Sequence, residues 1–168
     1  MRATFLAIHD AVVEIARWAA MTALVALVVL VVAAVVVRYF GIFGGSLHWV
    51  DESVRFVMIW MVMLGSVVAL DRGAHLAVAL LPDALGPRGR LAVIAMANLL
   101  AAAFTLILAW KGWELSQRTM RQVSPSLGLP MGYVYLAIPI SAAMMTVQLL
   151  AYTVMGRTRD PESSDANF

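Results

Sequence analysis

Four long stretches without any charged residue constrain this chain more than any other feature. They cover residues 18–37, 56–70, 91–110 and 133–155, and all 12 basic and 10 acidic residues lie outside them. A charge near the middle of a bilayer costs several kcal/mol on insertion scales, and a helix of about 20 apolar residues spans the hydrocarbon core. Backbone polar groups in lipid must be satisfied within each segment, which leaves helices. The pattern predicts an all-α membrane protein with four transmembrane helices.

The composition excludes several other classes of protein. Apolar residues make up 62% of the chain and charged residues 13%, whereas soluble domains are about 25% charged. The formal net charge of +2 is too small for a nucleic-acid-binding surface, so we expect no nucleic acid among the partners. The chain has no Cys, which excludes disulfides, thiolate metal sites and Cys nucleophiles.

The spans are expected to lie in one transmembrane domain over residues 18–155. Their expected bounds are about 18–38, 53–71, 90–112 and 133–155. The second charge-free stretch is short, and the aliphatic part of Arg55 extends it while the guanidinium reaches the headgroups.

Short interfacial amphipathic helices are expected beside the spans. In residues 1–17, Asp10, Glu14 and Arg17 recur at helical spacing among apolar residues, which predicts an amphipathic segment that lies on the membrane and then turns into the first span. A second short apolar stretch covers residues 75–81. The Ser- and Asp-rich residues 156–168 predict a mobile polar tail.

The distribution of basic residues gives the orientation. Four spans place both termini on one side, and seven of the 12 Lys and Arg residues fall on that side against five on the other. This bias predicts that both termini are cytoplasmic.

The spans carry no residue that chemistry at membrane depth would need. Proton relays and ion paths use buried acids or His, and haem between helices uses facing His pairs, but His9, His48 and His75 lie at or outside the span ends. We therefore expect no catalytic residue, no cofactor and no metal. The few polar residues within the spans are expected to hydrogen-bond neighbouring helices. They are Thr22, Ser66, Asn98, Thr105, Ser141, Thr146 and Gln148.

The second span and its flanks hold the most informative side chains. Asp51 and Glu52 lie where acids favour a helix N-terminus, and Arg55 follows at the spacing that allows it to pair with either. This group is either a charged helix cap or a polar contact to a partner subunit. Gly65 and Ala69 form a small-residue pair that lets another helix approach closely, either in this chain or in a partner.

Two sets of contact residues are hypothesised. The candidates for contacts with a partner subunit are Trp49, Glu52, Arg55, Trp60, Gly65, Ala69, Arg72 and His75. Lys111, Arg118 and Arg121 share one face of the helix that continues beyond the third span, and they either dock another protein or form a solvated helix end.

The same stretch resembles a known family. The residues are Trp49-Val50-Asp51-Glu52-Ser53-Val54-Arg55, Trp60, Leu64-Gly65 and Asp71-Arg72-Gly73-Ala74-His75-Leu76, followed later by Ser124-Pro125-Ser126-Leu127-Gly128-Leu129-Pro130 and Tyr135-Leu136-Ala137-Ile138-Pro139. In this order they are similar to the small membrane subunit (DctQ type) of tripartite ATP-independent periplasmic (TRAP) transporters. Ala79 departs from the pattern, since an acidic residue is expected there.

The resemblance implies a role that the composition does not reveal. In that family a periplasmic solute-binding protein captures an organic acid, such as a C4-dicarboxylate. A large membrane subunit in the bacterial inner membrane then carries it with Na+ or H+ in an elevator-like motion. The small subunit is a scaffold among the membrane lipids and holds no substrate.

Two other functions remain open from the sequence. A self-sufficient four-helix exporter would carry an acidic residue inside its first span, whereas Glu14 precedes the apolar run. A membrane enzyme or electron-transfer subunit would need the buried ligands that the spans lack.

Overall fold

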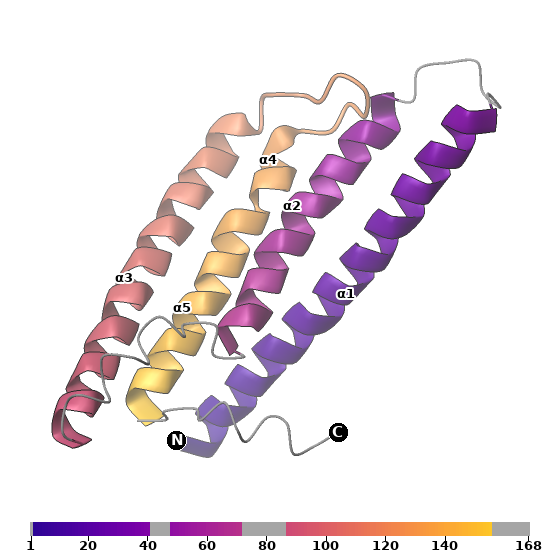
Figure 1. Cartoon of the computed structure of the whole chain (residues 1–168). Helices are drawn as coiled ribbons and strands as arrows, with labels where there is room; N and C mark the ends of the chain where they lie inside the picture. Colours follow the sequence, from indigo (N-terminus) through magenta and orange to yellow (C-terminus); the bar gives the residue numbers. More distant parts are fainter. Residues whose placement is uncertain (1, 41–47, 72–86, 156–168) are drawn as a thin grey trace, which may run out of the picture.

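The computed structural model describes residues 2–40, 48–71 and 87–155, and these residues are almost entirely helical (Figure 1). The helices are α1 (Arg2–Phe40), α2 (His48–Asp71), α3 (Pro87–Thr119), the short α4 (Met131–Tyr135) and α5 (Ala137–Met155). Within the described ranges the chain forms no strand, only an isolated bridge between Val123 and Pro130. The all-α class predicted from the sequence is confirmed.

Four helical segments are long and apolar enough to cross a membrane. They cover His9–Phe40, His48–Asp71, Ala95–Thr119 and Met131–Thr153, the last of which includes α4 and most of α5. This agrees with the predicted number of spans. Several helices run past the expected bounds, because a helix does not have to stop where the hydrocarbon ends.

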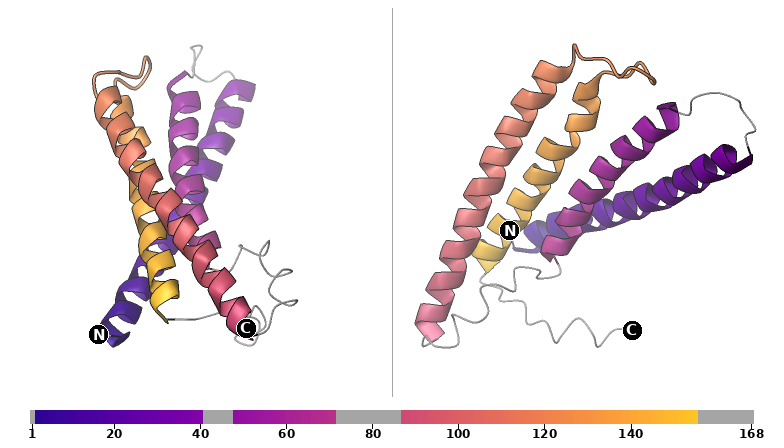
Figure 2. Two further views of the ribbon diagram at one scale, coloured as in Figure 1. Left: turned by 90° about the vertical axis from the view of Figure 1, so that its left-hand side faces the viewer. Right: turned by 45° about the horizontal axis from the view of Figure 1, so that its top comes forward.

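The long helices lie side by side in one layer, in the order α3, α5, α2, α1 (Figure 1). The packing is closest within two pairs, α1 with α2 and α3 with α5, and α2 packs on α5 to join them. Seen from the side, the two pairs cross each other (Figure 2). The start of α1 and the end of α5 lie at the same end of the layer, here named the terminal end. The opposite end, which carries the loop 120–130, is named the loop end.

The first span and the segment before it form one helix. α1 continues without a break from Arg2 to Phe40, so the expected turn near residue 17 is not present. Within this helix His9, Val13 and Ala16 form a buried stripe. Of the charged residues in this segment, Asp10 and Glu14 are exposed and Arg17 is half-buried. The location of this segment in the membrane interface stays a prediction.

Two glycines allow α3 to pack closely against the last part of the chain. A methyl group added at Gly112 would lie 2.8 Å from Cγ2 of Ile138 and 3.1 Å from the backbone nitrogen of Pro139. One added at Gly132 would lie 2.6 Å from the carbonyl oxygen of Ser116, whose hydroxyl donates to the Gly132 carbonyl over 2.9 Å. Neither position has room for a larger residue.

The polar residues inside the spans only partly follow the expectation. Thr105 and Thr146 share a hydrogen bond of 2.8 Å between α3 and α5. Thr22 and Ser66 instead donate to carbonyl oxygens of their own helices. Ser141 and Gln148 are fully buried, and their side chains make no hydrogen bond within the described ranges. A hydroxyl in a helix can be satisfied by the carbonyl one turn earlier, so it does not require a neighbour.

Candidate functional site

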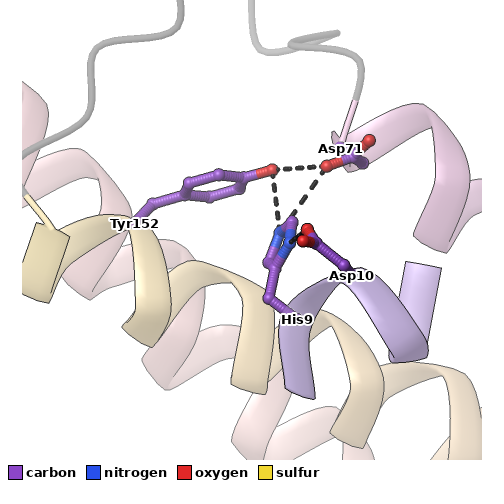
Figure 3. Close-up of polar contacts among 4 residues, drawn as sticks. All are labelled: His9, Asp10, Asp71 and Tyr152. Atoms are coloured by element: carbon purple, nitrogen blue, oxygen red, sulfur yellow. Dashed lines mark hydrogen bonds and ion pairs between the residues drawn. The ribbon is translucent and has the colours of Figure 1, made fainter. Parts of the chain in front are cut away.

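A buried polar cluster joins three helices at the terminal end of the layer (Figure 3). His9 from α1, Asp71 from α2 and Tyr152 from α5 point toward one another, and Asp10 lies beside His9. The Tyr152 hydroxyl donates to Oδ1 of Asp71 over 2.8 Å and lies 3.2 Å from Nε2 of His9. Nε2 of His9 is 3.6 Å from Oδ1 of Asp71. We call these four residues the terminal cluster.

The local sequence explains how each member reaches the terminal cluster. His9 lies on the apolar stripe of α1, so the helix turns it toward its neighbours, whereas Asp10 lies one position outside the stripe and is exposed. Asp71 is the last residue of α2, and Tyr152 lies in the last turn of α5. Because these two helices run antiparallel to α1 at this end, three polar side chains meet.

The tyrosine hydroxyl is the donor in the bond between Tyr152 and Asp71. Tyr152 has one hydroxyl proton, and the carboxylate of Asp71 can only accept it. Nε2 of His9 lies 3.2 Å from the tyrosine oxygen, and Nδ1 of His9 lies 3.2 Å from Oδ1 of Asp10. His9 and Asp71 are each only 7% exposed, so these contacts are largely shielded from water.

A second polar cluster lies at the loop end of the layer. One carboxylate oxygen of Glu52 accepts a short hydrogen bond from the Ser124 hydroxyl and two from the backbone amides of Ser126 and Leu127, at 3.2 and 3.3 Å. We call these four residues the loop cluster. It connects the start of α2 to the loop between α3 and α4.

The loop is shaped to present these donors. Its ends are paired through the bonds from Ser124 N to Leu129 O and from Met131 N to Gln122 O, at 2.9 and 2.8 Å. Gly128 has a φ of 64°, a conformation that glycine adopts without strain. The turn directs amides of residues 126 and 127 toward Glu52, so two fragments that carried the family resemblance meet here.

The ion pair that the sequence predicts among Asp51, Glu52 and Arg55 is not formed in the structure. Glu52 binds the loop, Arg55 and Asp51 are exposed, and neither of those two makes an ion pair with any residue in the described ranges. The pairing of Arg55 with Asp51 or Glu52 is therefore not formed. Donors of the loop bind the carboxylate of Glu52, and the side chain of Arg55 is exposed.

The remaining contact candidates fall into distinct environments. Trp49 is half-exposed at the loop end, whereas Trp60 is half-buried. Ala69 is exposed, and a methyl group added at Gly65 would meet nothing within 4 Å. Arg72 and His75 lie outside the described residues, as does the apolar stretch 75–81. The contacts proposed for these residues with another subunit stay predictions.

The basic face beyond the third span is partly neutralised. Lys111 pairs with Glu114 over 2.9 Å, and Arg118 pairs with the other oxygen of the same carboxylate. Arg121 is exposed, and it forms no ion pair with another described residue. Of the three basic residues, Arg121 is the one without an ion pair in the part of the chain that the structure describes, whereas Lys111 and Arg118 share one carboxylate.

The terminal cluster was not foreseen from the sequence. His9 and Tyr152 are 143 positions apart, and Asp71 and Tyr152 are 81 apart, so no local pattern connects them. The only signal is that His9 lies on the apolar stripe of its helix. Across residues 2–40, 48–71 and 87–155, no group of three or more His, Asp or Glu side chains is arranged to hold a metal ion.

Comparison with known proteins gives one family. The profile of the family described as "Tripartite ATP-independent periplasmic transporters, DctQ component" matches residues 27–159. A TRAP transporter small permease protein of Haemophilus influenzae is 26% identical over 116 residues, which cover 69% of this chain and 71% of that protein. The C4-dicarboxylate TRAP transporter small permease protein DctQ of Rhodobacter capsulatus is 31% identical over 109 residues, covering 64% and 48%.

A longer relative also matches. The isethionate TRAP transporter permease protein DctMQ of Oleidesulfovibrio alaskensis is 29% identical over 119 residues, which cover 67% of this chain but only 19% of that protein. The matched family region includes the loop cluster, two members of the terminal cluster and all four apolar segments in whole or in part. The chain therefore belongs to the DctQ component family of tripartite ATP-independent periplasmic transporters and is a multi-pass small permease subunit of such a transporter.

Proposed function

We propose that this subunit is the stationary scaffold of an organic-acid uptake system driven by a Na+ or H+ gradient. In this proposal a large membrane subunit moves the substrate, and a periplasmic binding protein delivers it. The present chain holds neither the substrate nor the coupling ion.

The distribution of charge carries the proposal. Residues 18–37, 56–70, 95–110 and 133–153 of the described helices contain no acid, base or His, and both polar clusters lie at the ends of the layer. A carrier of an anion with a cation would need ionisable groups near the bilayer midplane. Four apolar helices with polar ends suit a brace that stays at one depth in the membrane.

The longer relative supports a partner within the membrane. In the DctMQ protein, the part that resembles this chain belongs to a polypeptide about five times longer than the matched segment. A covalent link in one relative is consistent with a non-covalent neighbour in another. We infer that the neighbour here is a large membrane subunit.

The chemistry of the substrate is proposed only as a class. The names of two relatives contain C4-dicarboxylate and isethionate, a carboxylate and a sulfonate. Both are small organic anions, so we propose an organic acid as the transported compound. Its identity would be set by the binding protein and the large subunit.

We propose that the loop end faces the periplasm and that both termini face the cytoplasm of a bacterial inner membrane. The bias of basic residues supports this orientation. The exposed charge of Arg121 would then be available to the binding protein, with Lys111 and Arg118 in a lesser role because Glu114 offsets their charge. A thiol introduced at Arg121 should react with an impermeant reagent added outside the cell.

Reconstitution tests the proposed function. Vesicles that contain this subunit, the large subunit and the binding protein should accumulate a labelled organic acid when a cation gradient is imposed. Vesicles that lack only this subunit should accumulate little, although they contain equal amounts of the other two. Accumulation by vesicles that contain this subunit alone would overturn the proposal.

A further inference from the structure

One face of α2 is left uncovered along the whole span. Asp51, Arg55, Met58, Val62, Gly65 and Ala69 are spaced alternately by four and three residues, which places them in line along the helix. All are exposed except Gly65, which is half-buried but has open space in front of it. We call these six residues the open stripe.

The composition of the open stripe differs from that of a lipid-facing surface. Most exposed positions on α1 and α3 carry bulky apolar side chains, such as Val32 at 55% and Ile107 at 62% exposure, and the small exposed residues there are alanines such as Ala103 rather than glycines. Gly65 provides lipid with no side chain, and a glycine inside a helix is less favourable than alanine. A small residue in a transmembrane helix is favourable where a second helix packs closely against it.

The charged end of the open stripe also favours contact with another helix. Arg55 has Asp51 one turn before it, yet the two do not pair, and Arg55 has no other ion-pair partner in the described ranges. An exposed guanidinium in the first turns of a span can reach the lipid headgroups, or it can pair with a carboxylate on an adjacent helix. Only the carboxylate on an adjacent helix would also fix the register of a contact between helices.

The position of α2 excludes contact through the edge of the layer. α2 lies between α5 and α1, so both of its flanks are covered and only a broad face of the layer remains open (Figures 1 and 2). The alternate spacing of four and three residues has a mean of 3.5, which favours a nearly parallel or antiparallel helix with left-handed crossing.

We propose that the open stripe of α2 is the docking surface for one transmembrane helix of the large membrane subunit. That helix would place a bulky apolar side chain over Gly65 and a carboxylate beside Arg55. The inference rests on the proposed function, because it takes the large subunit as the partner. It adds which helix face of this chain makes the contact.

The absence of Cys makes the chain a suitable background for photo-crosslinking. A benzophenone maleimide is attached to a single Cys introduced at Met58 or Val62 in the complete complex in native membranes, and matched labels are placed at Val32 and Ile107. The stripe positions should give adducts with the large subunit in at least about tenfold higher yield than the two controls. Equal yields, or adducts only from the controls, would overturn the proposal.

A bulky substitution provides a second test. Gly65→Leu meets open space within this chain, so the subunit should still insert and fold, but the added side chain should lower recovery of the large subunit about tenfold or more. The matched control is Ala103→Leu, at an exposed position of α3. Unchanged recovery with Gly65→Leu would contradict the inference.

The charged end is tested in the same way. Arg55→Glu should lower recovery of the large subunit, and Arg55→Lys should restore most of it. Normal recovery with Arg55→Glu would indicate that a lipid headgroup, rather than the large subunit, meets this side chain, and would overturn this part of the inference. If the unmodified subunit does not recover the large subunit at all, the proposed function fails. If it does and the open stripe gives no adduct, only this inference fails.

Discussion

Removal of the Tyr152 hydroxyl should loosen the terminal end of the layer. Tyr152→Phe keeps the ring, which packs edge-on against His9 with 5.3 Å between centroids, and removes the hydroxyl that donates to Asp71 and lies 3.2 Å from Nε2 of His9. A hydrogen bond to a charged group contributes about 1.5–3 kcal/mol, whereas those between membrane helices average about 0.6 kcal/mol. His9 and Asp71 are both 93% shielded in the fold, which favours a strong hydrogen bond, but the cluster lies at the end of the spans, which weakens it. We therefore expect the free energy of opening this end of the layer to fall by about 1–2 kcal/mol.

A buried thiol can report this loosening. Val67 is fully buried in α2, one helical turn before Asp71, and Val67→Cys introduces the only thiol of the chain. A loss of about 1–2 kcal/mol corresponds to a population of open molecules about 5- to 30-fold larger. The rate at which a maleimide labels the thiol in mild detergent should increase by the same factor when Tyr152→Phe is added.

The adjacent hydroxyl gives a matched control for this measurement. Thr153 donates to the Leu149 carbonyl of its own helix over 2.9 Å, so Thr153→Val removes a hydroxyl without breaking a contact between helices. Its labelling rate should stay within about twofold of the parent, since such bonds add little. If Tyr152→Phe and Thr153→Val label equally fast, the terminal cluster does not hold the three helices together.

Three further changes test other parts of the structure. Gly112→Ala should destabilise the chain by about 1–3 kcal/mol, because the added methyl group would overpack the contact with the last helix. Gly65→Ala meets open space within the chain and should be neutral or stabilise the chain by up to about 1 kcal/mol. The same thiol labelling measures both changes. Glu52→Ala should free the loop that it binds, so backbone amides there should exchange with deuterium faster. Arg121→Glu should lower uptake by the assembled transporter more than Lys111→Glu does, because Lys111 pairs with Glu114 whereas Arg121 forms no ion pair with another described residue.

The controls for these changes lie close by in the chain. Asp51→Ala removes an exposed acid next to Glu52 that makes no ion pair in the described residues, and it should leave amide exchange in the loop unchanged. Equal exchange in the two variants would show that the loop is ordered without Glu52. Uptake must be compared at equal amounts of subunit in the membrane, and normal uptake with Arg121→Glu would reject docking through that residue.

The number of spans could be predicted because the free-energy cost of placing a residue in lipid depends on that residue and not on its tertiary contacts. A charge-free stretch of about 20 residues is a local property, and it survives folding unchanged. The break expected near residue 17 is absent because an amphipathic segment and an apolar one can share one helix axis. Composition separates the two environments, but it does not require the backbone to bend between them.

The contacts between helices could not be predicted in the same way. Glu52 is predicted as a contact to a partner subunit or as part of a charged helix cap, and its contact to another subunit stays a prediction. Within the chain it binds Ser124, which lies 72 positions away in a loop whose shape depends on Gly128. The partners of His9 depend on the order of helices in the layer, which periodicity within each helix does not define. Gly112 and Gly132 were overlooked, although a glycine within a long apolar helix is a general signal of close packing.

The two polar clusters also bear on how the layer resists motion along the membrane normal. A helix turn is about 5.4 Å long, so a shift of one turn would carry Glu52 and the loop it binds, or His9 and Asp71, toward the hydrocarbon. Each charged group moved to mid-bilayer costs about 2.5–3.5 kcal/mol on insertion scales, and a partial shift costs a fraction of that. Because the clusters lie at opposite ends, a shift in either direction is unfavourable. If the large subunit moves its substrate as we propose, it would push against this layer without displacing it, provided that the contact lies on a face that spans the full depth, as the proposed open stripe of α2 would.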